Sequence, residues 1–144
     1  MRFFDRQGAL DFLRTQGVSG ESDLERILGG FDFDRPVYEQ SFWQGDFLYQ
    51  LIRMPSASLP SPNVGNWFGI AGMTTHGVAI NDGVAGRRAV QFEVVSPFTA
   101  LEGSARPLPV DVFSAIGGAG GGTQVFVPTK LLGRLQSVGA VDRW

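Results

Sequence analysis

A glycine run that leads directly into a strand-like segment is the feature of this chain best suited to chemistry. Residues 117–122 read Gly-Gly-Ala-Gly-Gly-Gly, and Thr123 and Gln124 separate them from Val125-Phe126-Val127. Glycine has no Cβ and adopts positive φ at little cost, so such a run lets the backbone approach a ligand closely. The alternating segment that follows predicts a strand. Gln124 is therefore expected where an adaptable loop meets a stiff element, with an amide free to donate and accept hydrogen bonds.

Two further features could share a cleft with Gln124: Arg53 and the adjacent pair Trp67-Phe68. Arg53 lies near the end of a predicted strand over residues 46–54, on an otherwise apolar face, so it needs a carboxylate or an external anion. An arginine suits a diphosphate, an aromatic ring stacks on a planar base, and a glutamine orients a ribose hydroxyl or a water. This combination predicts a dinucleotide site. It is not a Rossmann site, because the glycines precede a strand instead of following one.

Each of these features has a structural alternative. Large aromatic side chains mostly fill protein interiors, so Trp67 and Phe68 could be core residues. The glycine run could be an inert loop. Three carboxylates could pair with the Arg53 side chain, namely Asp46, Glu93 and Glu102.

Composition excludes several kinds of site. The 144 residues are 43% hydrophobic and 18% charged with a net charge of −2, which indicates a globular protein without a nucleic-acid footprint. The absence of cysteine excludes disulfides, thiolate metal sites and thiol catalysis. The one histidine, His76, cannot by itself build an ordinary zinc site. No apolar run approaches the length of a membrane span, and no signal-peptide pattern opens the chain.

The N-terminal part, residues 1–43, is predicted to be helical. Asp5 is expected to cap a first helix that stops at Gly17. The sequence Ser22-Asp23-Leu24-Glu25 fits a capping box for a second helix, which Gly29-Gly30 would end. Packing against the core is the expected role of this part.

Residues 44–144 are predicted to form a β-rich catalytic core, within a single domain that spans residues 1–144. Strands are expected over residues 46–54 and 88–95, and a short final helix over residues 129–139. The residues expected to be buried in that final helix are Leu131, Leu132, Leu135 and Val138. The fold class is therefore α+β, a small central sheet with short helices at both ends.

The last two-thirds of the chain resembles the tuberculosis necrotizing toxin family. A strand that begins with an aromatic residue and is followed by a proline reads Phe92-Glu93-Val94-Val95-Ser96-Pro97. The glycine-rich turn of that family, Gly-Gly-Gly-x-Gln with an aromatic after it, reads Gly120-Gly121-Gly122-Thr123-Gln124-Val125-Phe126. Residues 65–73 resemble its glycine–aromatic segment, although Gly69-Ile70 stands where the family has serine–proline.

Members of this family are NAD(P) glycohydrolases with a fold distantly similar to that of ADP-ribosyltransferases. They are typically toxic C-terminal domains of larger secreted or injected proteins, and a cognate immunity protein neutralises them. The resemblance implies that NAD or NADP is the substrate at a cleft beside the glycine-rich loop, with no metal and no cofactor. It also implies a delivered toxin that acts in the target-cell cytoplasm, with an immunity protein as partner and neither nucleic acid nor membrane.

The resemblance also implies roles for individual residues. Gln124 matches the functional glutamine of the family, and Arg53 is the choice for its first arginine. The second cation stays open between Arg87 and Arg88, with His76 near the corresponding place. The other expected substrate-binding residues are Trp67, Phe68, Gly121, Gly122 and Thr123.

Cleavage of the nicotinamide–ribose bond passes through an oxocarbenium-like transition state and needs no strong general acid, because nicotinamide leaves from a cationic ring. ADP-ribosyl transfer is the alternative enzyme activity. The strand after the glycine loop lacks a glutamate, which favours hydrolysis, but Glu93 or Glu102 in the cleft would weaken that preference. A non-enzymatic binding domain is the other alternative. As a cleft residue, Gln124 is expected to change stability by less than about 0.5 kcal/mol when replaced by alanine.

Overall fold

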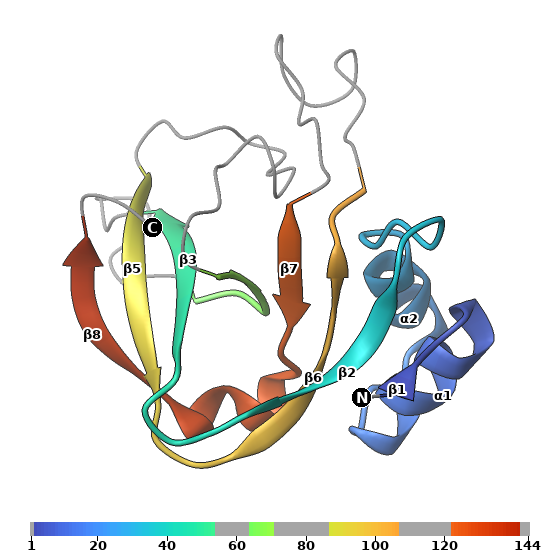
Figure 1. Cartoon of the computed structure of the whole chain (residues 1–144), viewed down its shortest axis with the longest axis horizontal. Helices are drawn as coiled ribbons and strands as arrows, with labels where there is room; N and C mark the ends of the chain where they lie inside the picture. The colour runs from blue at the N-terminus through green and yellow to red at the C-terminus, as the bar shows by residue number, and fades with distance from the viewer. Residues whose placement is uncertain (1, 54–63, 71–86, 107–121, 142–144) are drawn as a thin grey trace, which may run out of the picture.

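The computed structural model describes residues 2–53, 64–70, 87–106 and 122–141 (Figure 1). In residues 51–53, 87–89 and 140–141 only the backbone is described. None of the helices within these ranges is long and apolar enough to cross a bilayer.

Within the described ranges, eight antiparallel strands form one sheet. Their bounds are β1 (Arg2–Phe3), β2 (Val37–Phe42), β3 (Phe47–Arg53), β4 (Trp67–Gly69), β5 (Arg87–Val94), β6 (Phe98–Ser104), β7 (Thr123–Phe126) and β8 (Leu135–Val141). Their order across the sheet is β1-β2-β6-β7-β4-β3-β5-β8. The α+β prediction is confirmed, but the sheet is larger than the small central one that was expected.

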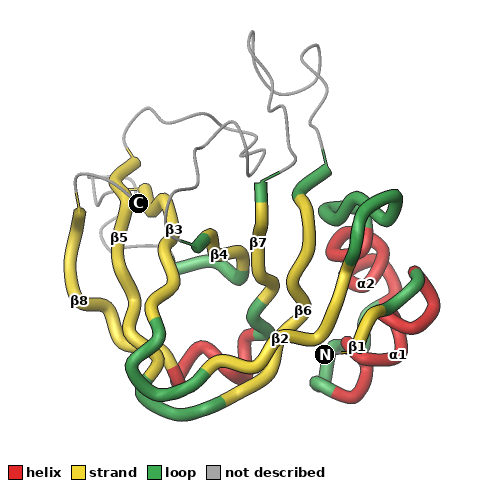
Figure 2. The backbone as a smooth tube through the Cα atoms, in the orientation of Figure 1, coloured by secondary structure: helices red, strands yellow, loops and turns green. Residues whose placement is uncertain are grey.

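The chain connections force this sheet to bend. Three strands separate β5 from β6 in the sheet, yet only residues 95–97 join them. A flat sheet would need about 19 Å for four strand spacings, whereas this connection reaches only about 14 Å when extended. The sheet therefore folds around β4 into two arms, β1-β2-β6-β7 and β3-β5-β8, as Figure 2 shows.

One end of the two arms is closed by two short connections. Residues 43–46 join β2 to β3, and they lie against the end of β5 because the Val94 amide donates to the Asp46 carbonyl at 2.8 Å. The opposite, open end carries the ends of β3 and β6 and the beginnings of β5 and β7 (Figure 1). The predicted site residues of these four strands are thus gathered at the open end.

The two arms enclose one apolar core, here called the inner core. Alternate residues of the strands supply it, because side chains along a strand alternate between the two faces. Its buried members are Phe42, Leu48, Phe68, Val90, Phe92, Val94, Phe98, Ala100, Val125 and Val127. The face of the sheet that carries them is called the inner face.

Two helices, α1 (Arg6–Thr15) and α2 (Glu21–Leu28), cover the outer face of the arm formed by β2, β6 and β7 (Figure 1). The buried residues of this second core are Ala9, Phe12, Leu13, Leu24, Ile27, Leu28, Phe31, Val37, Leu101 and Phe126. The predicted cap of α1 is confirmed, since an Asp5 carboxylate oxygen accepts from the Gly8 amide at 2.7 Å. Gly17 follows this helix with a φ of +90°, which suits glycine at a helix stop.

Two boundary predictions are wrong. The second helix begins at Glu21 after Gly20, so Ser22 lies inside the helix and does not cap it. The expected final helix is a 3₁₀ helix, η1 (Thr129–Arg134), followed by strand β8. β8 pairs with the edge of β5, and this pairing leaves Val138 55% exposed although it was expected to be buried. Tertiary pairing therefore outweighs the helical spacing of the leucines.

Candidate functional site

Trp67 and Phe68 are neighbours in strand β4, so their side chains lie on opposite faces of the sheet. Phe68 is 2% exposed, belongs to the inner core and packs edge-on against Phe92 with 5.4 Å between ring centroids. Trp67 lies on the outer side, 5.2 Å from the Phe31 ring and 5.1 Å from the Phe126 ring. Neighbouring residues of a strand face opposite sides, so a ligand on one face meets only one of these two rings.

Gln124 lies on the outer side, next to the helices. In the ladder between β4 and β7, Gln124 is directly opposite Gly69. The neighbouring pair, Phe68 and Val125, belongs to the inner core, so alternation places Gln124 on the other face. Its side chain is 6% exposed, and its Nε2 donates to the Gly30 carbonyl at 2.6 Å, just beyond the end of α2. The expectation of a free amide in a cleft is therefore wrong, because this amide links β7 to the helical part. A role for Gln124 in orienting a ribose hydroxyl or a water stays a prediction.

The register of β3 and β5 separates the three arginines. Arg53 is directly opposite Arg87, whereas Arg88 is opposite Ile52. Val90, two positions after Arg88, belongs to the inner core, so alternation places Arg88 on the inner face. By the same alternation Arg53 and Arg87 occupy the outer face.

Thr123 lies at the open end of the inner face. It is half-buried and pairs with Ser104, and both are two positions beyond the buried pair Glu102 and Val125. Arg88 stands at the corresponding place on the other arm, two positions from Val90. Of the predicted residues, the structure thus brings Phe68, Thr123 and the Arg88 position to one face.

A buried carboxylate shares this face. Glu102 is 4% exposed, and its Oε2 accepts from the Gln40 Nε2 at 3.1 Å. The Tyr38 side chain belongs to the same face, because Tyr38 is directly opposite Glu102 in the ladder between β2 and β6. Burial raises the pKa of Tyr38 above its ordinary value, and the hydrogen bond to Glu102 and the charge of Glu102 raise it further. Tyr38 is therefore a neutral donor throughout the physiological pH range.

One continuous row across the sheet joins this carboxylate to Phe68. Tyr38 is opposite Glu102, Glu102 is opposite Val125, and Val125 is opposite Phe68. Residues directly opposite each other in a ladder point to the same face. Two strand spacings, roughly 10 Å, separate the Glu102 and Phe68 backbones, with the small Val125 side chain between them.

The amide of Gln50 fixes the strand that carries Phe68. β3 and β4 share a single register pair, Tyr49 with Gly69. Gln50 adds side-chain bonds to the same strand: its Nε2 donates to the Gly65 carbonyl at 3.0 Å and to the Trp67 carbonyl at 2.8 Å. Its Oε1 accepts from the Gly65 amide at 3.0 Å. These bonds hold β4 between the two arms where the ladder alone is short.

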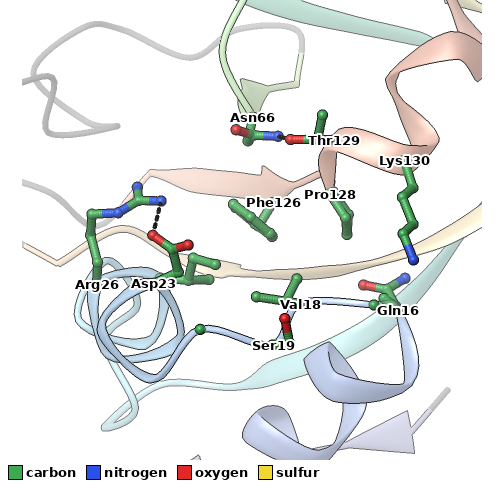
Figure 3. Close-up of a pocket in the computed structure, with 13 residues that line it drawn as sticks. Gln16, Val18, Ser19, Asp23, Arg26, Asn66, Phe126, Pro128, Thr129 and Lys130 are labelled. Carbon is green, nitrogen blue, oxygen red and sulfur yellow. Dashed lines mark hydrogen bonds and ion pairs between the residues drawn. The ribbon is translucent and has the colours of Figure 1, made fainter.

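A separate pocket of about 280 Å³ lies on the helical side (Figure 3). The link between α1 and α2 forms one wall, and the segment from Phe126 to Lys130 forms the other. Figure 3 shows Asn66 bonded to the Thr129 hydroxyl, and Arg26 paired with Asp23. Of the residues predicted from the sequence to bind substrate, those that the structure describes do not line this pocket.

Two predicted residues, His76 and Gly121, lie outside the described ranges. Gly122 is half-buried, and its carbonyl accepts from the Ala105 amide at 2.8 Å. Within those ranges no three acidic or histidine side chains gather as metal ligands.

The sequence reading missed Tyr38 and Gln50, and it named Glu102 only as a partner for arginine or as an acid of a transferase. One signal was available. In β6, Phe98-Thr99-Ala100-Leu101-Glu102-Gly103-Ser104, a glutamate occupies the alternating face that begins with Phe98 and Ala100.

Comparisons with known proteins establish the fold. No family matches the chain, and no curated protein resembles it significantly in sequence. The fold is similar to that of Tse6, solved in complex with Tsi6, with a TM-score of 0.68 and 22% identity over 96% of this chain and 94% of that chain. It is also similar to Rhs1-CT, solved with its cognate immunity protein RhsI1, with a TM-score of 0.53 and 16% identity over 88% and 98% of the two chains.

Proposed function

We propose that this chain is the toxin domain of a delivered effector and hydrolyses the nicotinamide–ribose bond of NAD(P). An immunity protein is made against a toxin, and Rhs1-CT was solved with its cognate immunity protein. The similarity covers nearly the whole length of both chains, so it concerns the complete fold and not a shared substructure. The proposal extends to delivery into a target cell, action in its cytoplasm and neutralisation by a cognate immunity protein.

The observation that carries the NAD(P) assignment is the order of residue positions along the inner face. Phe68 lies deeper, and Thr123 and the Arg88 position lie nearer the open end. An aromatic ring, a hydroxyl and a guanidinium in this order suit nicotinamide, ribose and diphosphate. Such a substrate would enter from the open end with its nicotinamide first.

The reaction needs little from an ionising group. The bond between C1′ and the ring nitrogen breaks, its electron pair neutralises the ring, and water attacks C1′ and then loses a proton. The arginine holds the diphosphate through charge-assisted hydrogen bonds. Positioning of the ribose and exclusion of bulk water lower the barrier by several kcal/mol. In this scheme Gln124 acts from behind β7, where its bond to Gly30 fixes the position of Thr123.

The position of Glu102 favours ADP-ribosyl transfer as the second candidate. A carboxylate on the inner face could activate an acceptor, and Glu102 is such a carboxylate. Both candidates release nicotinamide, but only hydrolysis releases free ADP-ribose in equal amount. Purified protein incubated with NAD and with NADP therefore separates them, when both products are measured by chromatography.

Arg87 and Arg88 provide a matched pair of variants. Arg88→Ala is expected to raise KM about tenfold or more, because one charge-assisted contact contributes about 1.5–3 kcal/mol. Arg87→Ala removes the same charge from the outer face and should leave KM within about twofold of the wild type, the scatter usual for a substitution away from the substrate. Folded protein that releases no nicotinamide from either dinucleotide would refute the enzyme assignment. The reverse ranking of the two variants would refute the inner-face placement.

A further inference from the structure

Glu102 is a buried carboxylate whose partners among the described side chains are neutral. Gln40 donates to it, Tyr38 is directly opposite it in the ladder, and in the described part of the chain it forms no ion pair. A buried charge without a counter-charge is costly, and a neutral residue of the same shape would avoid that cost. A carboxylate has about four acceptor positions, so the bond from Gln40 leaves acceptor capacity for a further group.

We propose that Glu102 is the anionic group of a subsite for a planar organic cation, which in this chain is the nicotinamide ring of NAD(P)⁺. This proposal rests on the proposed function for the identity of the ligand. It assigns to the buried Glu102 the recognition of the charge on the ring, and to Phe68 the recognition of its flat face.

Three features of the structure support the subsite. The row Tyr38–Glu102–Val125–Phe68 places the carboxylate and the aromatic ring on one face, with small Val125 between them. An aromatic face and an anion together favour a flat cation. Gln40 donates to the carboxylate at 3.1 Å and holds it in place, and Tyr38 beside it stays neutral because burial raises its pKa.

A ligand would reach the subsite from the open end of the two arms. Ser104 and Thr123 are half-buried and lie two positions beyond the buried row on the same face. Their hydroxyls form a polar approach from the open end to the buried carboxylate.

Bond cleavage moves the positive charge from the ring to the ribose, so Glu102 strengthens binding of the oxidised dinucleotide more than it assists bond breaking. Loss of its charge is therefore expected to raise KM, with kcat equal to or above that of the wild type, because the attraction weakens as the bond breaks. The reduced dinucleotide, whose ring is neutral, should be a weak ligand of the wild type. Released nicotinamide is neutral too and should leave easily.

Two small probes test the subsite without catalysis: 1-methylnicotinamide, which is cationic, and nicotinamide, which is neutral and nearly the same shape. Isothermal titration should show that the wild type binds the cation at least about tenfold more tightly, because opposite charges about 5 Å apart attract strongly in a protein interior. Glu102→Gln should bind both probes equally and keep or raise Tm. Glu39→Gln, which removes a carboxylate from β2 that pairs with Arg2 at 3.3 Å, should keep the preference.

The outcomes separate the two proposals. A wild type without a preference for the cation, or a folded Glu102→Gln variant that keeps the preference, would overturn the subsite. A preference that depends on Glu102 in a protein that does not hydrolyse NAD(P) would refute the proposed function and leave the subsite standing. If Glu102→Gln does not fold, NMR titration of the wild type decides: the cation must shift the Tyr38 and Phe68 ring signals at concentrations where nicotinamide does not, and equal responses overturn the proposal.

Discussion

Replacing Gly30 by alanine tests the contact between the helical part and the sheet. A Cβ at this position would lie 2.8 Å from Trp67 Cη2 and 2.9 Å from Trp67 Cζ2. The indole has little freedom to move away, because the rings of Phe31 and Phe126 lie 5.2 Å and 5.1 Å from it. Gly30 does not have a positive φ, so the backbone itself tolerates alanine, and the perturbation is the crowding of the new Cβ, mainly against Trp67 and less closely against the Ile27 carbonyl oxygen at 3.3 Å.

The expected loss of stability is about 2 kcal/mol. Overpacking of a core by one carbon costs about 1–3 kcal/mol, and the confined indole favours the upper half of that range. Alanine offsets part of this cost, roughly 0.4–1 kcal/mol, by reducing the entropy of the unfolded chain. For a chain of this size the net loss corresponds to a fall in Tm of about 8 °C. Urea unfolding followed by circular dichroism measures the free energy directly.

A double-mutant cycle identifies the cause. Trp67→Phe removes the atoms that clash, so Gly30→Ala should cost at least about 1 kcal/mol less in that background. Gly45→Ala serves as the control: its φ is +95° with no heavy atom within 4 Å of the new Cβ, so its cost is backbone strain of about 1–2 kcal/mol and should not depend on Trp67. Equal costs of Gly30→Ala in the two backgrounds would show that the packing argument is wrong.

Two further predictions concern buried polar groups. Gln124→Ala should lower the free energy of unfolding by about 1–3 kcal/mol, because it removes a buried side chain together with its hydrogen bond to the Gly30 carbonyl; a change below about 0.5 kcal/mol in urea unfolding would match a surface residue and contradict the burial seen here. Tyr38 has a folded pKa above the unfolded value of 10.0, so its contribution to stability is fully present below pH 10 and declines as the pH rises above it, by up to about 1.4 kcal/mol per pH unit. Tyr38→Phe should remove this share of the decline between pH 10 and 11, and an unchanged slope would contradict the raised pKa.

Capping residues, glycine stops and short strand-like segments correctly predicted the elements that they belong to or bound. Asp5 and Gly17 predicted α1, and residues 46–54 and 88–95 predicted β3 and β5 to within one residue at each end. Such patterns depend on a few neighbouring residues, so the sequence displays them directly.

The elements that the sequence did not reveal depend on distant partners. β8 exists because β5 offers a free edge, and the leucines before it favour a helix when they are considered alone. β6 is buried on both faces over most of its length, so its sequence shows no clear alternation between apolar and polar residues. The bend between the two arms follows from short connections between strands that the sequence alone does not place in order.

The candidate site, too, was predictable from the sequence only in part. The residue types were recognisable from the sequence, but the faces on which they lie required the register. Trp67 and Phe68 are adjacent in a strand, so they could have been assigned to opposite faces from the sequence. The side taken by Gln124 became visible only when Gly30 was found beside it, 94 positions earlier in the chain.

The fold similarity and the register answer different questions about this chain. At 22% identity the similarity to Tse6 establishes the arrangement of strands and assigns no residue a role. The register does assign positions: the Arg88 position shares the inner face with Val90, and the Arg87 and Arg53 positions share the outer face. Two neighbouring arginines of equal charge must then differ in their effect on substrate binding if the substrate lies between the arms. Comparison of folds alone gives no reason to expect such a difference, so its measurement tests the placement of the site on this chain's own residues.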